Sequence, residues 1–280
     1  MDPYYNRYYV RWPGFRRKAL TLSYDDGVRQ DARMIEILDL YGLRATFNLN
    51  GGDFALDPPP LRDHPRLTRA EALALYGGSP HEVAAHGFGH PFLEQLPAGT
   101  AAWEAVRCRE ALEAFFGALV RGFAYPMGTW NDDIAETLRL CGLAYARTTP
   151  VTHSFDLPKD FYRLQGTCRG TDPALFDLGE DFLALDPPWG PKLFYIWGHS
   201  YEFDEPGGWD RLERFCRRMG GHTDIWYATN LEICDYLTAC GQLRASMNGR
   251  VIQNPTAATL YLDTRSGPTT LAPGQTLTLA

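Results

Sequence analysis

The sequence lacks the features that a nucleic-acid or membrane protein would carry. Its 280 residues have a net charge of -7, and the basic residues form no long run, Arg16, Arg17 and Lys18 being the nearest to one. Binding to nucleic acid or to an anionic membrane surface depends on such a basic patch, so we expect neither. No apolar stretch approaches membrane-spanning length, so we expect no membrane insertion.

Export signals and paired cysteines are also missing. The Tyr-rich start has no apolar core of a signal peptide. None of the six cysteines stands in a Cys-x-x-Cys pair, which excludes a zinc knuckle and a redox pair. Buried free thiols favour a reducing compartment. We therefore expect a cytoplasmic protein, an extracellular or cell-wall location being the alternative if a leader is removed. The cysteines are Cys108, Cys141, Cys168, Cys216, Cys234 and Cys240.

What the chain does contain is a regular alternation of strand-like and helix-like segments, which predicts a parallel sheet or barrel. The strands are expected at 18–24, 45–49, 81–85, 122–126, 143–148, 161–164, 192–197 and 224–228. The helices are expected at 68–76, 100–116, 132–140, 172–185, 209–219 and 230–240, with a first one at 31–40. Asn230 is the expected cap of the last helix, and Trp103, Val106, Leu112, Phe115 and Phe116 are the expected buried face of 100–116.

The composition changes after Gly241, to Asn, Thr, Gly, Pro and β-forming residues. Strands are expected at 251–252, 259–262 and 271–279, with turns at Asn248-Gly249 and Pro273-Gly274. With 45% hydrophobic residues the chain can bury one sizeable core. We expect an N-terminal arm (1–17), a barrel (18–242) and a small β-rich extension (243–280).

Candidate metal ligands follow two of the predicted strands. Asp25 and Asp26 are adjacent acids before Gly27, a pattern typical of an Asp-Gly turn or of a cation site. His86 and His90 have the i, i+4 spacing that lets two imidazoles face one ion. Asp26, His86 and His90 would together give one carboxylate and two imidazoles, with positions left for water and substrate.

Other candidates also fall at the carboxyl ends of strands, the rim where barrel enzymes place their chemistry. Pro126 and its neighbours and His199 lie there. Four aromatic residues are expected either in a substrate pocket or in the core: Tyr125, Tyr195, Trp197 and Trp226. His64, His153 and His222 are expected on the surface or in loops.

These patterns resemble the polysaccharide deacetylases of carbohydrate esterase family 4, the nodulation-factor deacetylase homology domain, over most of residues 18–239. Asp25-Asp26-Gly27 is similar to the end of that family's Thr-Phe-Asp-Asp-Gly motif, and His86 to His90 is similar to its His-Thr/Ser-x-x-His motif. Residues 123–128 stand in the place of its Arg-Pro-Pro-Tyr-Gly motif, and Trp197-Gly198-His199 in that of its Leu-x-His motif. The resemblance implies a distorted (β/α) barrel of about seven parallel strands.

Two positions depart from the family pattern. Ala124 stands where many members carry an arginine that orients the base. Arg147 is the candidate replacement, a solvated surface arginine being the alternative. The family's Asp-Trp motif, which tunes the acid histidine, has no clear counterpart. Either Asp224 with Trp226, or Glu202 with Asp204, would fill its place.

The resemblance implies a hydrolase that removes N-acetyl groups from an amino-sugar polymer or oligosaccharide such as peptidoglycan, a chitin-like chain or poly-N-acetylglucosamine. It assigns Asp25 as the base, His199 as the acid, and Asp26, His86 and His90 as ligands of a divalent ion. Zinc is the first expectation, with Co²⁺, Ni²⁺ or Mn²⁺ as alternatives. The substrate or oxyanion residues expected are Tyr125, Pro126, Met127, Trp197 and Arg147.

Three alternatives stay open on the same sequence. Relatives of this family hydrolyse O-acetyl xylan or the cyclic amide allantoin, some of them without metal. A carbohydrate-binding protein with a relic site is the non-catalytic alternative. In each acetyl-hydrolase case the expected partner is an acetylated carbohydrate, and the sequence predicts no oligomeric state.

Overall fold

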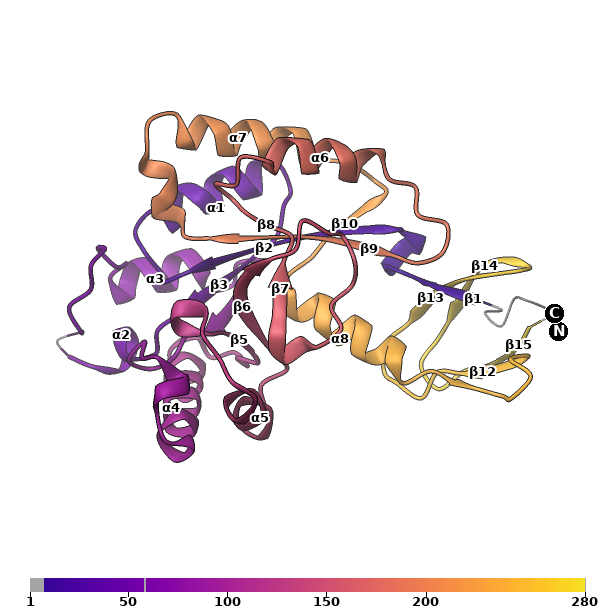
Figure 1. Cartoon of the computed structure of the whole chain (residues 1–280), viewed down its shortest axis with the longest axis horizontal. Helices are drawn as coiled ribbons and strands as arrows, with labels where there is room; N and C mark the ends of the chain where they lie inside the picture. The colour runs from indigo at the N-terminus through magenta and orange to yellow at the C-terminus, as the bar shows by residue number, and fades with distance from the viewer. Residues whose placement is uncertain (1–7, 58, 280) are drawn as a thin grey trace.

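A parallel sheet closed into a distorted barrel forms the centre of the molecule (Figure 1). The structure, a computed structural model, describes residues 8–57 and 59–279. The hydrogen-bonded strand order is β7-β6-β5-β4-β3-β2-β9-β8, with β10 beside β2, and every adjacent pair in this sheet is parallel. This confirms the predicted fold. The strands are β2 (Lys18–Asp25), β3 (Ala45–Leu49), β4 (Glu82–Ala85), β5 (Gly122–Ala124), β6 (Tyr145–Val151), β7 (Leu164–Gly166), β8 (Cys168–Arg169), β9 (Lys192–Gly198) and β10 (Ile225–Tyr227).

One short stretch of chain closes the barrel. β7 pairs with β6, β8 pairs with β9, and only Thr167 separates the two strands. The Thr167 amide donates to the Tyr195 carbonyl at 2.6 Å, and its hydroxyl accepts from the Tyr195 amide at 3.1 Å. The sheet therefore joins its two ends through consecutive residues of one segment. The sequence predicts a strand at 161–164, but residues 161–163 form a 3-10 turn and the strand begins at Leu164.

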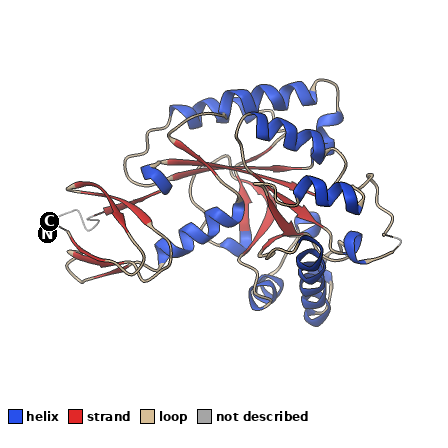
Figure 2. Cartoon of the chain, turned by 180° about the vertical axis from the view of Figure 1, so that it is seen from behind, coloured by secondary structure: helices blue, strands red, loops and turns tan. Residues whose placement is uncertain are grey.

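Helices cover the outside of the sheet (Figure 2). They are α1 (Asp31–Leu40), α2 (Gly52–Ala55), α3 (Arg69–Tyr76), α4 (Ala98–Phe116), α5 (Asp132–Leu140), α6 (Leu175–Ala184), α7 (Gly208–Met219) and α8 (Asn230–Gly241). Within the described ranges, no helix is both long and apolar enough to cross a bilayer. Figure 1 shows α1, α6 and α7 along one side of the barrel and α4 and α5 on the other.

The cap of α8 differs from the prediction. The Thr229 hydroxyl accepts from the Glu232 amide and the Glu232 side chain accepts from the Thr229 amide, a complete capping box. Asn230 is instead the first helical residue, and its side chain points into the barrel, where it accepts from Thr21 and donates to Tyr195. Asn230 therefore forms buried hydrogen bonds inside the barrel and does not cap the helix.

The buried face of α4 matches the prediction only in part: Leu112 is fully buried and Phe115 and Phe116 pack on the core, but two of the predicted residues are not buried. Trp103 and Val106 are 49% and 46% exposed, whereas the small residues Ala101, Ala105 and Cys108 are fully buried. The reason is close backbone approach: a side-chain carbon added at Gly51 would lie 2.5 Å from the Cys108 Cα. Only small side chains fit between α4 and the loop that it covers.

A small β unit stands at one end of the molecule, on the right in Figure 1. β1 (Tyr8–Arg11) pairs with β13 (Leu260–Thr264), which pairs with β14 (Gly267–Leu271); β11 (Arg244–Ala245), β12 (Val251–Gln253) and β15 (Thr276–Thr278) form a second sheet. Ile252, Leu262, Leu271 and Leu279 fill the space between them. The turn predicted at Pro273 and Gly274 is present, and it separates the end of β14 from β15.

The segments predicted as an arm and as an extension belong together in this β unit. Residues 1–7 of the arm lie outside the described residues, but β1 joins β13 along its whole length. Arg11, 1% exposed, forms an ion pair with Asp263 at 2.5 Å and donates to the Pro188 carbonyl. Arg11 therefore joins β1 to β13 within the β unit and also joins the unit to the rest of the chain at Pro188.

Candidate active site

The carboxyl ends of three barrel strands bring four candidate residues to one rim. Asp25 ends β2 and is followed by Asp26, His86 follows β4, and His199 follows β9. These residues line one cavity of about 460 Å³. The predicted residues that line it are Asp25, Asp26, His86, His90, Tyr125, Met127, Trp197 and His199. Pro126 and Arg147 do not line it; both are buried behind it.

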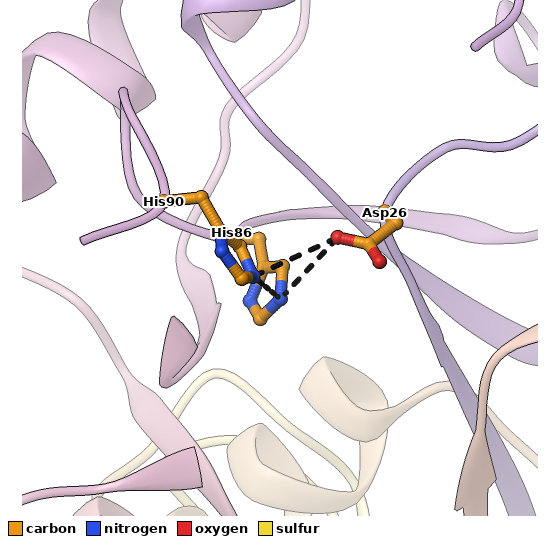
Figure 3. A group of neighbouring side chains, drawn as sticks. All are labelled: Asp26, His86 and His90. Carbon is orange, nitrogen blue, oxygen red and sulfur yellow. Dashed lines mark hydrogen bonds and ion pairs between the residues drawn. The ribbon is translucent and has the colours of Figure 1, made fainter. Parts of the chain in front are cut away.

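Asp26, His86 and His90 converge on a common point (Figure 3). The Nε2 atoms of the two histidines are 3.1 Å apart, and they lie 3.8 Å (His86) and 3.7 Å (His90) from Oδ1 of Asp26. Tetrahedral zinc with ligand distances of about 2.1 Å requires its donor atoms to be about 3.4 Å apart. The three donors therefore fit a divalent ion held by one carboxylate and two imidazoles.

The backbone sets the tautomer of His86. Its Nδ1 lies 2.8 Å from the Ala124 carbonyl oxygen, which can only accept, so Nδ1 carries the proton and the Nε2 lone pair faces Asp26 and His90. Burial lowers the pKa of His86, and burial and the neighbouring His86 lower the pKa of His90 to about 4. Both rings are thus neutral near pH 7, the form that binds metals.

Backbone strain is concentrated at this site. Asp26, His90 and Met127 have φ values of 83°, 65° and 59°, in the left-handed region that non-glycine residues rarely occupy. Such conformations cost on the order of 1 kcal/mol or more each and persist where the surroundings impose them. For Asp26 the amide donates to the Asn48 carbonyl at 2.9 Å. Three strained residues around one cavity are more typical of a functional site than of ordinary turns.

Asp25 is held from below by an arginine and an asparagine. Both of its carboxylate oxygens contact Nη2 of Arg147, and Oδ1 also accepts from Nδ2 of Asn48 at 2.9 Å. Burial opposes ionisation of Asp25, but the charge of the contacting Arg147 guanidinium outweighs it and holds the pKa of Asp25 well below its usual value. Asp25 is therefore ionised throughout the neutral range.

Arg147 lies in register with the position where the family motif has its arginine. Ala124 of β5 pairs with Arg147 of β6, so the two positions are neighbours across one ladder. Arg147 is fully buried, which excludes the alternative of a solvated surface arginine. The guanidinium of Arg147, carried by the neighbouring strand β6, thus reaches the carboxylate of Asp25 from the same layer of the barrel.

Glu202 is the carboxylate that contacts His199. Oε1 of Glu202 lies 2.9 Å from Nδ1 of His199. The other ring nitrogen of His199, Nε2, lies 3.9 Å from Oδ2 of Asp25 and 3.9 Å from Oδ2 of Asp26. Burial acts to lower the pKa of His199, but the hydrogen bond that its ring donates to Glu202 and the charges of the two aspartates raise it overall. Asp224, which with Trp226 was the other candidate partner of His199, lies away from the rim. It forms an ion pair with Lys18 at 2.8 Å.

The four aromatic candidates divide between cavity and core. Tyr125 and Trp197 line the cavity, and Trp197 lies 4.7 and 4.5 Å from the guanidinium carbons of Arg147 and Arg169. The Tyr195 hydroxyl accepts from Asn230 inside the barrel, and Trp226 packs against Trp12 with ring centres 5.4 Å apart. Neither of the last two lines the cavity.

Comparison with known proteins agrees with this geometry. Residues 14–146 match the family model described as polysaccharide deacetylase. This part of the chain, just under half of its length, is therefore similar to the polysaccharide deacetylases. No curated protein matches the sequence.

Solved structures of this family share the fold. A family 4 carbohydrate esterase from Streptomyces lividans, in complex with acetate, is 18% identical, with a TM-score of 0.51 over 76% of this chain and 93% of its own. A protein from Mycobacterium smegmatis assigned to the polysaccharide deacetylases is 19% identical, with a TM-score of 0.59 over 83% and 94%. A mutant of a Bacillus anthracis family 4 pseudoenzyme with restored enzymatic activity is 17% identical, with a TM-score of 0.52 over 81% and 70%.

Several residues of this cavity were not predicted from the sequence. Arg62, Arg66, Arg169 and Tyr201 line it, and Asn48 supports Asp25 from beneath. His64, predicted as a surface or loop residue, also lines the cavity, because its ring stacks on Tyr201 at 3.7 Å. No local pattern marks these residues: Arg62, His64 and Arg66 lie in the irregular loop between α2 and α3, whereas Asn48, Arg169 and Tyr201 come from β3, β8 and the 3-10 turn after β9. His153 and His222 lie elsewhere and bind Asp172 and the Arg218 carbonyl.

Proposed function

We propose that this protein is a metal-dependent hydrolase that removes N-acetyl groups from an amino-sugar polymer or oligosaccharide. The observation that carries the proposal is the arrangement of Asp26, His86 and His90, whose donor atoms lie within 4.8 Å of one another. Asp25 and His199 flank this group. The match to the polysaccharide deacetylase family model supports hydrolysis of acetyl groups, and the arrangement of acid and base supports an amide as the bond that is broken.

The donor set suits a divalent ion with affinity for imidazole and carboxylate, zinc before Co²⁺, Ni²⁺ or Mn²⁺. When bound, such an ion supplies Lewis acidity toward the acetyl carbonyl and toward water. Asp26, His86 and His90 would hold it. The remaining chemistry belongs to side chains that are not ligands.

Asp25 is the proposed general base. Its Oδ2 lies 3.9 Å from Nε2 of His86 and 3.9 Å from Nε2 of His199, so the carboxylate sits between the ligand group and the acid. It would accept the proton of the attacking water. Arg147 and Asn48 fix the direction of its oxygens, so that no reorientation is needed during the reaction.

His199 is the proposed general acid. The contact between Glu202 and Nδ1 leaves Nε2 pointing toward the two aspartates, and the raised pKa keeps the ring protonated to a higher pH. It would donate the Nε2 proton to the leaving amine. An amine leaves poorly unless it is protonated, whereas an alcohol leaves an ester more readily, so an acid placed here favours N-acetyl substrates.

The central experiment measures acetate release from an N-acetylglucosamine oligomer together with the metal content of the protein. A chelator should abolish release and added zinc or cobalt should restore it. His86→Ala should lose both metal and activity, and metal should not rescue it. His153→Ala is the matched control, because His153 lies outside the cavity and pairs with Asp172. Full activity of His86→Ala with unchanged metal content would contradict the proposal.

Amide and ester substrates separate the main alternatives. The same preparation should be offered the N-acetylated oligomer and an O-acetylated xylan oligomer. His199→Ala should lose far more activity on the amide than on the ester. Acetate release from the ester alone would favour the esterase, and no release from either would favour the non-catalytic alternative.

A further inference from the structure

Residues 61–66, in the loop between α2 and α3, form one wall of the cavity. Arg62, His64 and Arg66 line it, with Leu61 and Asp63 beside them. The Arg29 amide donates to the Pro65 carbonyl at 3.1 Å, and the Leu67 amide donates to the Gly27 carbonyl at 3.3 Å. The wall is therefore attached by backbone hydrogen bonds to the turn that follows Asp26.

The wall also reaches the loops that carry the other site residues. Nη1 of Arg62 donates to the Gly89 carbonyl, next to His90, at 3.2 Å. Nη2 of Arg66 lies 3.3 Å from Oδ1 of Asp26. The ring of Tyr201 stacks on His199 on one side, at 4.9 Å, and on His64 at 3.7 Å. Substrate atoms next to the acetyl group must therefore pass close to residues 61–66.

This wall carries more positive than negative charge. Arg62 and Arg66 share a single buried carboxylate, Asp53, at 3.0 and 3.5 Å. Asp63 also lines the cavity, but it is exposed to solvent, where water and salt screen its charge. The second partner of Arg66 is Oδ1 of Asp26.

Oδ1 of Asp26, which pairs with Arg66, is the same oxygen that faces His86 and His90. An ion held by these three residues would take that oxygen as a ligand, so its charge would no longer neutralise Arg66. Two guanidinium groups would then share one carboxylate. The excess positive charge lies beside the point where the acetyl group must bind.

A third arginine lies on the same cavity. The Arg169 side chain is 41% exposed, contacts Glu202 and lies over the Trp197 ring at 4.5 Å. Its carboxylate partner is shared with His199. Its orientation is thus fixed by stacking while part of the guanidinium stays open to the cavity.

We propose that the substrate of this site carries a carboxylate next to its acetylated group, and that Arg62 and Arg66 bind this carboxylate with Arg169 completing the site. The inference rests on the proposed function and narrows it to acidic acetylated sugars. Arginine is suited to this role because its planar fork of N–H donors matches the two oxygens of a carboxylate.

The test compares two sugars that differ by one carboxylate. Binding of N-acetylmuramic acid and of N-acetylglucosamine to the protein, with and without added zinc, is measured by calorimetry at low and high salt. The acidic sugar should bind about tenfold more tightly at low salt, and the preference should shrink as salt screens it. Equal binding of the two sugars at low salt overturns the proposal.

Variants of Arg62 test whether residues 61–66 cause the preference for the acidic sugar. Arg62→Gln should remove most of the preference for the acidic over the neutral sugar, while Arg62→Lys should keep part of it. Arg244→Gln, an exposed change in β11, is the control. An unaltered preference in Arg62→Gln contradicts the assignment, and if that variant fails to fold, the salt dependence of the wild type still decides.

The outcome separates this inference from the proposed function. If the protein prefers the acidic sugar but releases no acetate from any substrate when loaded with zinc, the hydrolase proposal fails and the binding site stands. If acetate is released from both sugars with equal kcat/KM and both bind equally, the hydrolase proposal stands and the carboxylate site is wrong.

Discussion

Arg147 contacts both carboxylate oxygens of Asp25 from a position with no exposure to solvent. Removing the guanidinium would leave a buried carboxylate without its charge partner, and breaking a buried ion pair in this way costs about 3–5 kcal/mol. Arg147→Gln should therefore lose about that much unfolding free energy. Its activity should fall by at least about a hundredfold, because Asp25 would bind a proton more readily and lose its orientation. Denaturant unfolding and steady-state kinetics measure the two effects.

The control for this variant is Arg121→Gln, which breaks the exposed pair with Asp235. Exposed pairs contribute at most about 1 kcal/mol. If both arginine variants had the same stability and the same kcat, the role given to Arg147 would be wrong.

The two adjacent aspartates should separate into two phenotypes. Asp25→Asn should keep its metal and lose activity, because Oδ1 of Asp26 lies within 3.8 Å of the Nε2 atoms of both histidines, whereas Asp25 approaches His86 at 3.9 Å and is held by Arg147. Asp26→Asn should lose metal affinity, since a neutral amide is a poorer ligand than a carboxylate. Metal analysis beside acetate release distinguishes them. Loss of metal from Asp25→Asn, with Asp26→Asn still loaded, would reverse the assignment.

Glu202 should set the pH range of the reaction through His199. Its hydrogen bond at 2.9 Å raises the pKa of His199, and this protonated ring is the proposed acid. In Glu202→Gln that pKa should fall, so the alkaline limb of the profile of kcat against pH should move to lower pH. Asp204→Asn is the control, because Asp204 bonds to Gln30 and Trp209 and not to His199. Unchanged limbs in Glu202→Gln would count against the role of Glu202.

Asp31 should make the protein less stable as pH rises. It is fully buried between the hydroxyls of Ser200 and Tyr76, and burial raises its pKa from 3.8 to about 7. The folded state thus holds its proton more tightly than the unfolded state does. The stabilisation is complete below pH 3.8 and is lost as pH rises toward 7, by on the order of 3 kcal/mol.

The Asp31→Asn variant removes this titration. Its unfolding free energy should change less than that of the wild type between pH 4 and 7, as measured by urea unfolding at several pH values. Asp235→Asn, at an exposed position, should follow the wild type. Parallel curves for wild type and Asp31→Asn would show that the carboxyl of Asp31 does not titrate as described.

The sequence alone was sufficient to predict the part of the site where residue type and strand pattern indicate the same positions. Asp26, His86 and His90 could be grouped because their residue types suit a metal and because parallel strands end at one rim. The structure brings these three side chains together. The place of Arg147 could be proposed but not decided, since its contact with Asp25 depends on the register between β5 and β6.

The misses have physical causes that no local pattern reports. The face of α4 was assigned from its apolar residues, but the close approach of Gly51 to Cys108 requires small residues there, and Trp103 is half exposed. His64 and Arg62 belong to an irregular loop whose path is set by contacts with Asp53, Gly89 and Tyr201. Such contacts are distant in sequence, and neither propensity nor spacing encodes them.

The pairing of β1 with β13 has a consequence for biosynthesis. Arg11 and Asp263 are 252 residues apart, so β1 leaves the ribosome long before its partner exists. Until residues 260–264 are made, one edge of a nascent strand stays open to mispairing with other chains. Contacts of such long range also form slowly. Prematurely terminated chains that stop before β13 should therefore be the products most prone to aggregate.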